Sequence, residues 1–368
     1  MKSKVRHVMG ISGGKDSAAL AIYVKDKYPQ LDVEYYFCDT GKELDETYEL
    51  IRNLEIYLGK KVTKIGAAPN SHEDPFDHFL KLYGGYLPSS SSRWCTRKLK
   101  LEPFEKWIGS DPVISYVGIR GDEDREGYIS KKSTVQSIFP FRKNIWSEDV
   151  IAKALNNNNI NLICQYYKEQ SLGDKLSRVL EVVIEPISES FSVHNKLNTL
   201  LDFSISAFNN VVFSFLKTTK YPLATTAEFP LTTNEDVLNR DDIFRILRES
   251  GVGVPKYYEK LEYTVDGKKG EYARSRSGCF FCFFQQKIEW VWLFEQHPTL
   301  FEKALAYEKE GYTWMQNEKL EDIIQPERIH QIKSEQLTRD KKRNKSNSPY
   351  LLDILDEAEG EGCAACFV

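Results

Sequence analysis

Long apolar runs are missing from this chain of 368 residues. No stretch approaches the roughly 18 to 20 consecutive apolar residues of a membrane-spanning helix, so we expect no membrane contact. The first residues, MKSKVRHVMGIS, also lack the apolar core and small-residue cleavage site that a secretory signal requires. We therefore expect a cytoplasmic protein.

Positive charge is not in excess either. A formal net charge of −4 argues against a protein that coats nucleic acid through its overall electrostatic field, although a local contact stays open. The chain is nevertheless long enough for a nucleotide-binding domain and a second folded unit. Length and composition together favour a two-part protein.

Histidine is scarce, and none lies near the cysteine pairs of the sequence. Seven cysteines in a reducing compartment are not expected to form a disulfide framework, and four of them fall in two C-x-x-C pairs, Cys279 with Cys282 and Cys363 with Cys366. That spacing is typical of metal or redox chemistry. A zinc site would require a fourth ligand, which no neighbouring histidine supplies.

Two kinds of segment alternate in the first third of the sequence. The predicted strands cover 5–12, 32–41, 60–66 and 112–120, and the predicted helices cover 16–28 and 42–59. Strands that alternate with helices favour an α/β fold with a doubly wound parallel sheet. Ligands of such sheets bind at the carboxyl ends of the strands, where 12–17, 39–41 and Arg120 would meet.

The pattern changes beyond this first unit. We predict a nucleotide-binding domain over 1–125 and a mostly helical insertion over 126–235. A helical region that carries Cys279 and Cys282 is predicted over 236–335, packed on the active site. The biased composition of 336–368 predicts a flexible charged tail.

The turn SGGKDS joins the first strand to the first helix. Glycines let backbone N–H groups approach an oxyanion, and the following helix N-terminus adds partial positive charge, although a lone S-G-G is usually just a turn. Asp16 would repel a phosphate unless a cation mediates, which indicates Mg²⁺ with pyrophosphate. The candidate phosphate-binding residues are Ser12, Gly13, Gly14, Lys15, Asp16 and Ser17.

Four motifs in order resemble the PP-loop ATP pyrophosphatases, in the branch similar to phosphoadenosine-phosphosulfate (PAPS) reductases. They are SGGKDS, CDTGKELDET, RWCTRKLK and GIRGDEDR. The resemblance implies an adenine nucleotide α-hydrolase-like (HUP) fold that binds ATP and Mg²⁺. It also implies cleavage between the α and β phosphates, with AMP placed on a substrate oxygen. The implied catalytic residues are Lys15, Asp16, Ser17 and Arg120.

Asp39 and several cations extend this implied site. Asp39 ends the second predicted strand, where a carboxylate can reach ribose or Mg²⁺, or can instead form an Asx turn before Gly41. Arg93 and Arg120 are better candidates for phosphate binding than Arg97 and Lys98. Acidic residues next to Arg120 are expected to form an ion-paired loop.

Cys95 lies in the third motif. The resemblance implies that Cys95, Cys279 and Cys282 hold a [4Fe–4S] cluster with one iron open or with a fourth ligand that the sequence does not identify. Cys363 and Cys366 are candidates for a persulfide relay or are incidental residues of an unstructured tail.

The C-terminal segments GVGVPKYYEK and RSRSGCFFCFF resemble PAPS-reductase-like proteins linked to DNA phosphorothioation and phage defence. This implies a sulfurtransferase that adenylates nucleic acid, DNA in preference to tRNA, with a cysteine desulfurase and other defence-system subunits as partners. Three alternatives stay open: a PAPS reductase forming sulfite, a tRNA thiolation enzyme, and a non-catalytic ATP-sensing subunit. A basic stretch is either solvated or faces nucleic-acid phosphates: Arg339, Lys341, Lys342, Arg343 and Lys345.

Overall fold

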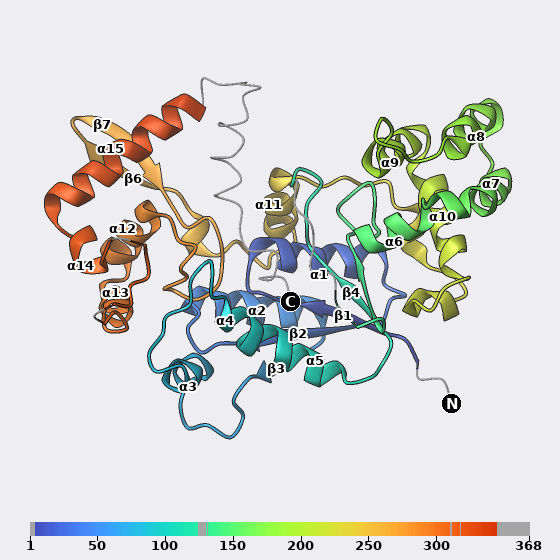
Figure 1. Ribbon diagram of the computed structural model, residues 1–368. Helices are drawn as coiled ribbons and strands as arrows, with labels where there is room; N and C mark the ends of the chain where they lie inside the picture. Colours follow the sequence, from blue (N-terminus) through green and yellow to red (C-terminus); the bar gives the residue numbers. More distant parts are fainter. Residues whose placement is uncertain (1–3, 124–129, 131, 310, 317, 344–368) are drawn as a thin grey trace.

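A five-stranded parallel sheet forms the centre of the computed structural model, which describes residues 4–123, 130, 132–309, 311–316 and 318–343 (Figure 1). The strand order is β3-β2-β1-β4-β5, and every neighbouring pair is parallel. The strands are β1 Arg6–Gly10, β2 Val33–Asp39, β3 Val62–Gly66, β4 Val113–Tyr116 and β5 Val135–Ile138.

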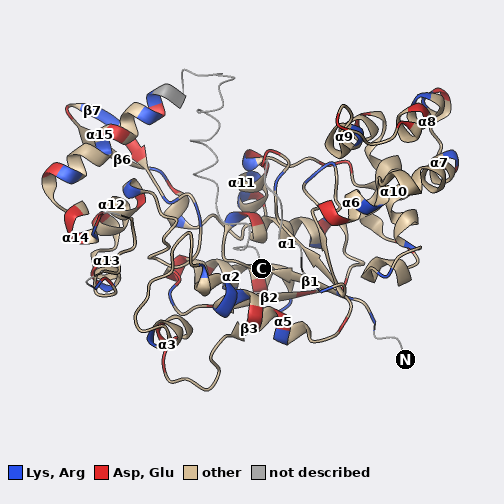
Figure 2. Cartoon of the chain, viewed as in Figure 1, with Lys and Arg blue, Asp and Glu red and all other residues tan. Residues whose placement is uncertain are grey.

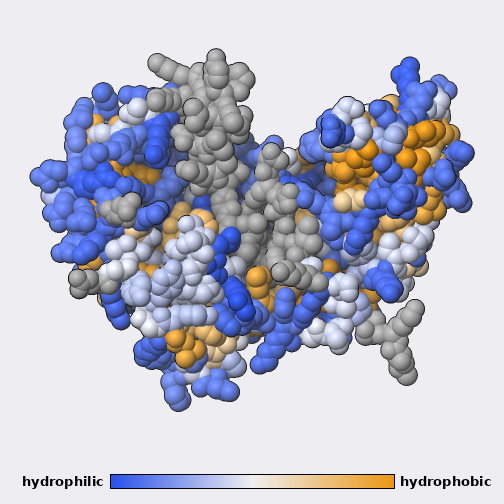
Figure 3. All heavy atoms as spheres, in the orientation of Figure 1, coloured by the Kyte–Doolittle hydropathy of each residue, from blue (hydrophilic) through white to orange (hydrophobic). Residues whose placement is uncertain are grey.

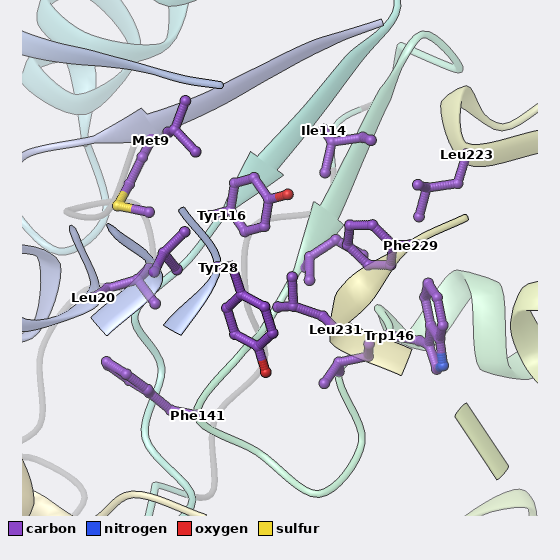
Figure 4. Close-up of a cluster of buried hydrophobic side chains, with 14 of the residues drawn as sticks. Met9, Leu20, Tyr28, Ile114, Tyr116, Phe141, Trp146, Leu223, Phe229 and Leu231 are labelled. Atoms are coloured by element: carbon purple, nitrogen blue, oxygen red, sulfur yellow. The ribbon is translucent and has the colours of Figure 1, made fainter. Parts of the chain in front are cut away.

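Helices cover both faces of this sheet. On one face, Met9 and Phe37 share a core with α1 (Lys15–Lys27) and α2 (Asp45–Leu58); Figure 4 shows part of this core. On the other face, Val8 and Tyr36 pack with α5 (Glu102–Ile108). The predicted α/β fold with a doubly wound parallel sheet is therefore confirmed.

One continuous helical stretch carries the RWCT motif. It consists of α4 (Trp94–Thr96), a π-helical turn (Arg97–Leu101) and α5. Pro103 lies in the first turn of α5 and has no backbone N–H to donate. The wider π-helical turn lies directly before α5. This stretch begins at the RWCT motif, and α3 (Pro75–Leu82) lies beside it.

The described residues of 126–235 are largely helical and also include β5. Four residues are too short for the alternation of a strand to stand out from the sequence, so the sheet extends beyond the boundary at 125. The helices of this insertion lie on the right in Figure 1 and share the α1 core: α6 Glu148–Ala154, α7 Ile160–Lys168, α8 Leu176–Ile184, α9 Val193–Phe203 and α10 Ile205–Leu216.

A second core lies in the C-terminal region, on the left in Figure 1, and also includes residues of α3 and α4. Its antiparallel hairpin joins β6 (Leu261–Val265) to β7 (Lys268–Tyr272). The helices of the region are α11 Arg240–Glu249, α12 Lys287–Gln296, α13 Pro298–Leu305, α14 Leu320–Ile323 and α15 Pro326–Arg343. Short 3₁₀ turns cover Asn157–Asn159, Gly173–Lys175, Pro222–Thr225, Pro230–Thr233 and Lys256–Tyr258.

Acidic and basic residues alternate along the surface helices, with both signs on α15 (Figure 2). Hydrophobic atoms reach the surface over the insertion helices at the upper right of Figure 3. Ile184, the last residue of α8, is exposed. Within the described part of the chain, no helix is both long enough and apolar enough to cross a bilayer.

Candidate nucleotide-binding site

The glycine turn lies between the end of β1 at Gly10 and the start of α1 at Lys15. Its strand, β1, stands between β2 and β4, so the chain leaves β1 toward one side of the sheet and later returns on the other. This switch in strand order opens a crevice at the carboxyl ends of the strands. The N-terminus of α1, which spans 13 residues, lies at that crevice.

Gly13 gives the turn its shape. Its φ of +73° is strained for any residue with a side chain, and a Cβ at this position would lie 2.2 Å from Cγ2 of Thr47 on α2. The turn therefore packs against α2 in a form that only glycine permits.

Ser12 and Ser17 hold the turn from within. The backbone N–H of Ser12 donates to Oγ of Ser17 at 3.1 Å, and the Ser17 hydroxyl donates to the Gly14 carbonyl at 3.2 Å. The two hydroxyl oxygens lie 3.1 Å apart. Both predicted serines thus meet at the turn, where they fix its backbone before any anion binds.

A buried ion network joins this turn to the loop after β4. Asp16 lies 3.1 Å from Nζ of Lys15 and 3.0 Å from a terminal nitrogen of Arg120, and all three side chains are less than 10% exposed. The same Arg120 nitrogen lies 2.5 Å from Glu123, and Nε of Arg120 lies 2.8 Å from Asp122. The structure thus brings together Lys15, Asp16 and Arg120, and the expected ion pairing of the acidic loop is present.

The pKa values of this network follow from its packing. Burial would raise the pKa of Asp16, but the charges of Lys15 and Arg120 outweigh it, and the pKa lies below its ordinary value. Burial would lower the pKa of Arg120, but Asp16 and Glu123 keep it above its ordinary value. Asp16 is thus an ionised carboxylate at the turn, with the ligand chemistry that Mg²⁺ prefers.

Asp39, at the end of β2, is held by three donors. Its carboxylate accepts from the Gly41 N–H at 2.9 Å and from the Tyr48 hydroxyl at 2.8 Å, and it pairs with Lys64 at 2.8 Å. Burial raises the pKa of Asp39, but Lys64 and the other donors lower it further, so the net shift is downward. The Asx turn that we considered is formed, and a role at ribose or Mg²⁺ stays a prediction.

Glu43 is a residue that sequence reasoning missed. Its carboxyl group accepts from Oγ1 of Thr40 at 2.7 Å and from the Tyr48 hydroxyl at 3.2 Å. Burial, and then the charge of Asp39, raise the pKa of Glu43. Glu43 lines a small pocket beside the glycine turn, together with Ser12, Cys38, Lys100 and Gly278 among others. Glu43 lies inside the second of the four motifs, CDTGKELDET, but the sequence assigns it no role within that motif.

Residues more than 240 positions away close the turn from the C-terminal region. The Tyr257 hydroxyl donates to the Gly13 carbonyl at 2.8 Å, and the Lys15 N–H donates to the Tyr258 hydroxyl at 3.4 Å. Nζ of Lys15 lies 5.1 Å from the centre of the Tyr258 ring. The segment GVGVPKYYEK, which the sequence singled out through its resemblance to phosphorothioation proteins, therefore supplies two tyrosines to the site.

The GCFFC turn reaches the loop after β2. Cys279 pairs with Glu43 through a backbone bridge, and Sγ of Cys279 lies 3.2 Å from Oγ1 of Thr40. Burial, and then the charge of Glu43, raise the pKa of Cys279 well above its ordinary value.

Cys95 and Cys279 both pack against the second core. Among the residues that the structure describes, no three Cys, His, Asp or Glu side chains form a group that could hold a metal ion. The predicted set of Cys95, Cys279 and Cys282 therefore does not fit a [4Fe–4S] cluster as arranged, and no reaction step is assigned to one.

The other predicted cations have separate surroundings. The guanidinium of Arg93 lies 5.4 Å from the centre of the Phe284 ring, and that of Arg276 lies 5.6 Å from the same centre. Lys98 pairs with Glu102 at 2.9 Å, as Arg97 does at 3.1 Å. Arg93 thus lies beside the GCFFC segment, whereas Lys98 and Arg97 bind a carboxylate of their own helix.

Parts of the predicted tail lie outside the described residues, among them Cys363, Cys366 and Lys345. Arg339 and Lys341 belong to the last turns of α15, and the backbone of Lys342 and Arg343 continues that helix. The basic stretch thus begins on a helix, and its contact with nucleic acid stays a prediction.

A protein-family match covers the part of the chain that carries the glycine turn. Residues 6–177 match the phosphoadenosine phosphosulfate reductase domain family. An uncharacterized protein of Methanocaldococcus jannaschii is 32% identical over 151 residues, which are 38% of this chain and 30% of that protein. An uncharacterized nin region protein of Escherichia phage lambda is 29% identical over 145 residues, or 32% of this chain and 49% of that protein.

A tRNA-specific 2-thiouridylase of Actinobacillus succinogenes is 23% identical over 167 residues, or 37% of this chain and 42% of that enzyme. The chain therefore spans less than half the length of the curated relatives that it matches. All four predicted motifs lie within 6–177. These matches support a place for the sheet domain in the PAPS-reductase-like PP-loop family.

Proposed function

We propose that this protein is an ATP pyrophosphatase that cleaves ATP between the α and β phosphates and places AMP on an oxygen of a nucleic acid. A persulfide sulfur supplied by a cysteine desulfurase then displaces that oxygen as AMP, and a second thiol breaks the remaining S–S bond by forming a disulfide, which leaves sulfur on the nucleic acid. The observation that carries the proposal is the ion network of Lys15, Asp16 and Arg120 at the glycine turn of β1 and α1.

The residues of the turn have distinct parts in this reaction. The N–H groups of Gly13, Gly14 and the first turn of α1 bind the oxygens of the leaving pyrophosphate. Asp16 is the carboxylate that would hold Mg²⁺ against those oxygens. Lys15 and Arg120 stabilise the negative charge that develops as the bond between the α-phosphorus and the bridging oxygen breaks.

For the acceptor, we propose the DNA backbone, on the resemblance of the C-terminal segments to phosphorothioation proteins. The similarity to enzymes named tRNA-specific 2-thiouridylases favours tRNA as the second candidate. The chain has a net charge of −4, so its overall field does not attract DNA or tRNA. It must bind the nucleic acid through a local basic surface or through a partner, such as another defence-system subunit.

The test measures pyrophosphate release from ATP by the full-length protein, with DNA, with tRNA and with neither. The proposal predicts release that increases with the accepted nucleic acid, and mass spectrometry of nuclease digests from expressing cells should identify sulfur in that acceptor. Sulfur in a tRNA base would replace DNA by the second candidate. Formation of ADP and orthophosphate would contradict α–β cleavage.

Two alternatives give different products in the same assays. A PAPS reductase would form sulfite from PAPS without ATP, and a non-catalytic ATP sensor would bind ATP without forming any product. Iron and sulfide analysis of anaerobically purified protein adds an independent measurement: the arrangement of Cys95, Cys279 and Cys282 predicts no bound cluster, and iron found together with sulfide would contradict it.

A further inference from the structure

Arg274, between β7 and the GCFFC turn, is buried to 2% exposure. One terminal nitrogen donates to the Cys279 carbonyl at 3.1 Å, and the guanidinium carbon lies 6.0 Å from the centre of the Tyr257 ring. The other two nitrogens, Nε and NH1, are buried without a hydrogen-bond partner. Within the described part of the chain, no carboxylate forms an ion pair with Arg274.

Such a side chain is costly to bury. A guanidinium is always charged in proteins, and a buried charge without a counter-ion loses its hydration without recovering that free energy elsewhere. The single bond to the Cys279 carbonyl satisfies one of three nitrogens. The remaining two are donors that an anion of the right size would satisfy.

The segment around Arg274 lies directly on the glycine turn. The Arg274 N–H donates to the carbonyl of Tyr257, whose hydroxyl reaches the Gly13 carbonyl at 2.8 Å. Oγ of Ser277 donates to the Ser12 carbonyl at 3.4 Å, and a Cβ on Gly14 would lie 2.6 Å from that same Oγ. Arg274 is therefore linked to the turn through Tyr257 and through the loop that carries Ser277.

The cations already at the turn are paired. Lys15 and Arg120 carry two positive charges, against three negative charges on Asp16, Asp122 and Glu123. These five described side chains thus sum to one negative charge. A polyphosphate at the turn requires additional positive charge from the protein or from a metal ion.

We propose that Arg274 is an anion-binding residue of this site and donates Nε and NH1 to the phosphate oxygens of a ligand held at the glycine turn. The ligand class is a nucleoside polyphosphate, and the part bound is its pyrophosphate end. This inference rests on the proposed function for the identity of the ligand, whereas the unpaired buried cation is independent of it.

The test compares two arginines by titration of inorganic pyrophosphate into the full-length protein. Arg328 is the matched control because it pairs with Glu318 through two nitrogens, at 2.5 and 3.1 Å. We expect Arg274→Gln to weaken pyrophosphate binding about 10- to 100-fold, the range for charge-assisted hydrogen bonds, and to leave the melting temperature without ligand unchanged or higher. Arg328→Gln should lower that melting temperature and leave pyrophosphate affinity unchanged.

Arg274→Lys provides a second variant that keeps the charge and loses the planar donors, and it should bind pyrophosphate with intermediate affinity. If the glutamine variant does not fold, a loss of at least threefold in the lysine variant supports the proposal. Wild-type affinity in a folded Arg274 variant overturns it, as does a wild-type protein that does not bind pyrophosphate. Adenosine, which lacks phosphate, should bind all variants alike.

The outcome is separable from that of the proposed function. Binding of pyrophosphate through Arg274 with no pyrophosphate released from ATP would refute the proposed reaction and leave the anion site. If the wild type releases pyrophosphate from ATP and the Arg274→Gln variant binds pyrophosphate with wild-type affinity, the proposed reaction stands and the anion site at Arg274 is refuted.

Discussion

Arg120 and Arg274 are both almost fully buried near the same glycine turn, but their surroundings are opposite. Arg120, on the loop after β4, contacts three carboxylates, whereas Arg274, from the C-terminal region, forms an ion pair with none among the described residues. The first arrangement is complete without a ligand. The second leaves two donors unsatisfied.

This difference separates two tasks in one site. A paired cation holds its carboxylates in position, so Arg120 orients Asp16 where a metal ion or phosphate can reach it. An unpaired cation gains most when an anion arrives, because the ligand removes the cost of its burial. The sheet domain thus positions the reacting groups, and the C-terminal region supplies positive charge.

The largest effect should come from breaking the paired arrangement. Asp16→Asn removes the carboxylate between Lys15 and Arg120, and Ser17→Ala removes the hydroxyl that bonds the Gly14 carbonyl. Each should lower pyrophosphate release from ATP by about 10²-fold or more, because preorganised electrostatic contacts of this kind are worth that much. Circular dichroism should show an intact fold, since Arg120 keeps Asp122 and Glu123. Release at the wild-type rate from both variants would discard the assignment of the turn.

The next effect concerns the shape of the turn. Gly13→Ala combines a positive φ with a clash at Thr47, and should destabilise the fold by about 2–4 kcal/mol and reduce ATP binding. Gly59→Ala is the control, because Gly59 at the end of α2 has a φ of +65° with open space around it. It should cost about 1 kcal/mol.

Thr47→Ser removes the methyl group that a Cβ on Gly13 would strike. The double variant Gly13→Ala with Thr47→Ser should therefore recover part of the loss in a chemical denaturation experiment. Equal stability of the two glycine variants would mean that the turn adapts, and the packing of α2 against it would not be a constraint.

Much of the fold was predictable because its signals are local. Gly59 ends α2 with a left-handed φ of +65°, and the alternation of strands and helices gave the parallel sheet. The hairpin of β6 and β7 was missed, although Asp266 and Gly267 both have positive φ, and Asp-Gly between alternating residues is a hairpin signal. We predicted a helical region over 236–335 around the cysteine motif, and that prediction did not include the hairpin.

The residues of the site also divide into those that local motifs predicted and those that they did not. The glycine turn, Asp16 and Arg120 were found because their motifs sit at strand ends that a parallel sheet brings together. Tyr257, Glu43 and Arg274 were not, since their roles depend on packing between segments more than 200 residues apart and on burial, which one sequence does not reveal. The same packing places Sγ of Cys279 next to Thr40 rather than in a metal-binding group.

A smaller effect tests whether Glu43 compensates Arg274, since both segments contact Cys279. The folded-state pKa of Glu43 is raised above its ordinary 4.5, so the stability that it contributes is fully present below pH 4.5 and is lost as pH rises through the folded pKa. Glu43→Gln should therefore equal the wild type in melting temperature near pH 4 and become relatively more stable as pH increases. If Glu43 instead neutralised Arg274, the variant would be the less stable protein at neutral pH.

The smallest effect should come from a paired arginine outside the site. Hydrogen bonds from Arg328 lower the pKa of Glu318 to about 2, helped by Lys287 at 2.5 Å. The lowered pKa means that the stability from Glu318 is present above pH 4.5 and is lost as pH falls toward 2. Glu318→Gln should lower the melting temperature by about 1–3 °C at pH 7, as expected for a partly exposed ion pair, with no change in pyrophosphate affinity. The difference from the wild type should shrink when the measurement is repeated below pH 4. A constant difference across that range would mean that Glu318 acts through packing, and pairing with a carboxylate would then not explain why Arg328 and Arg274 differ.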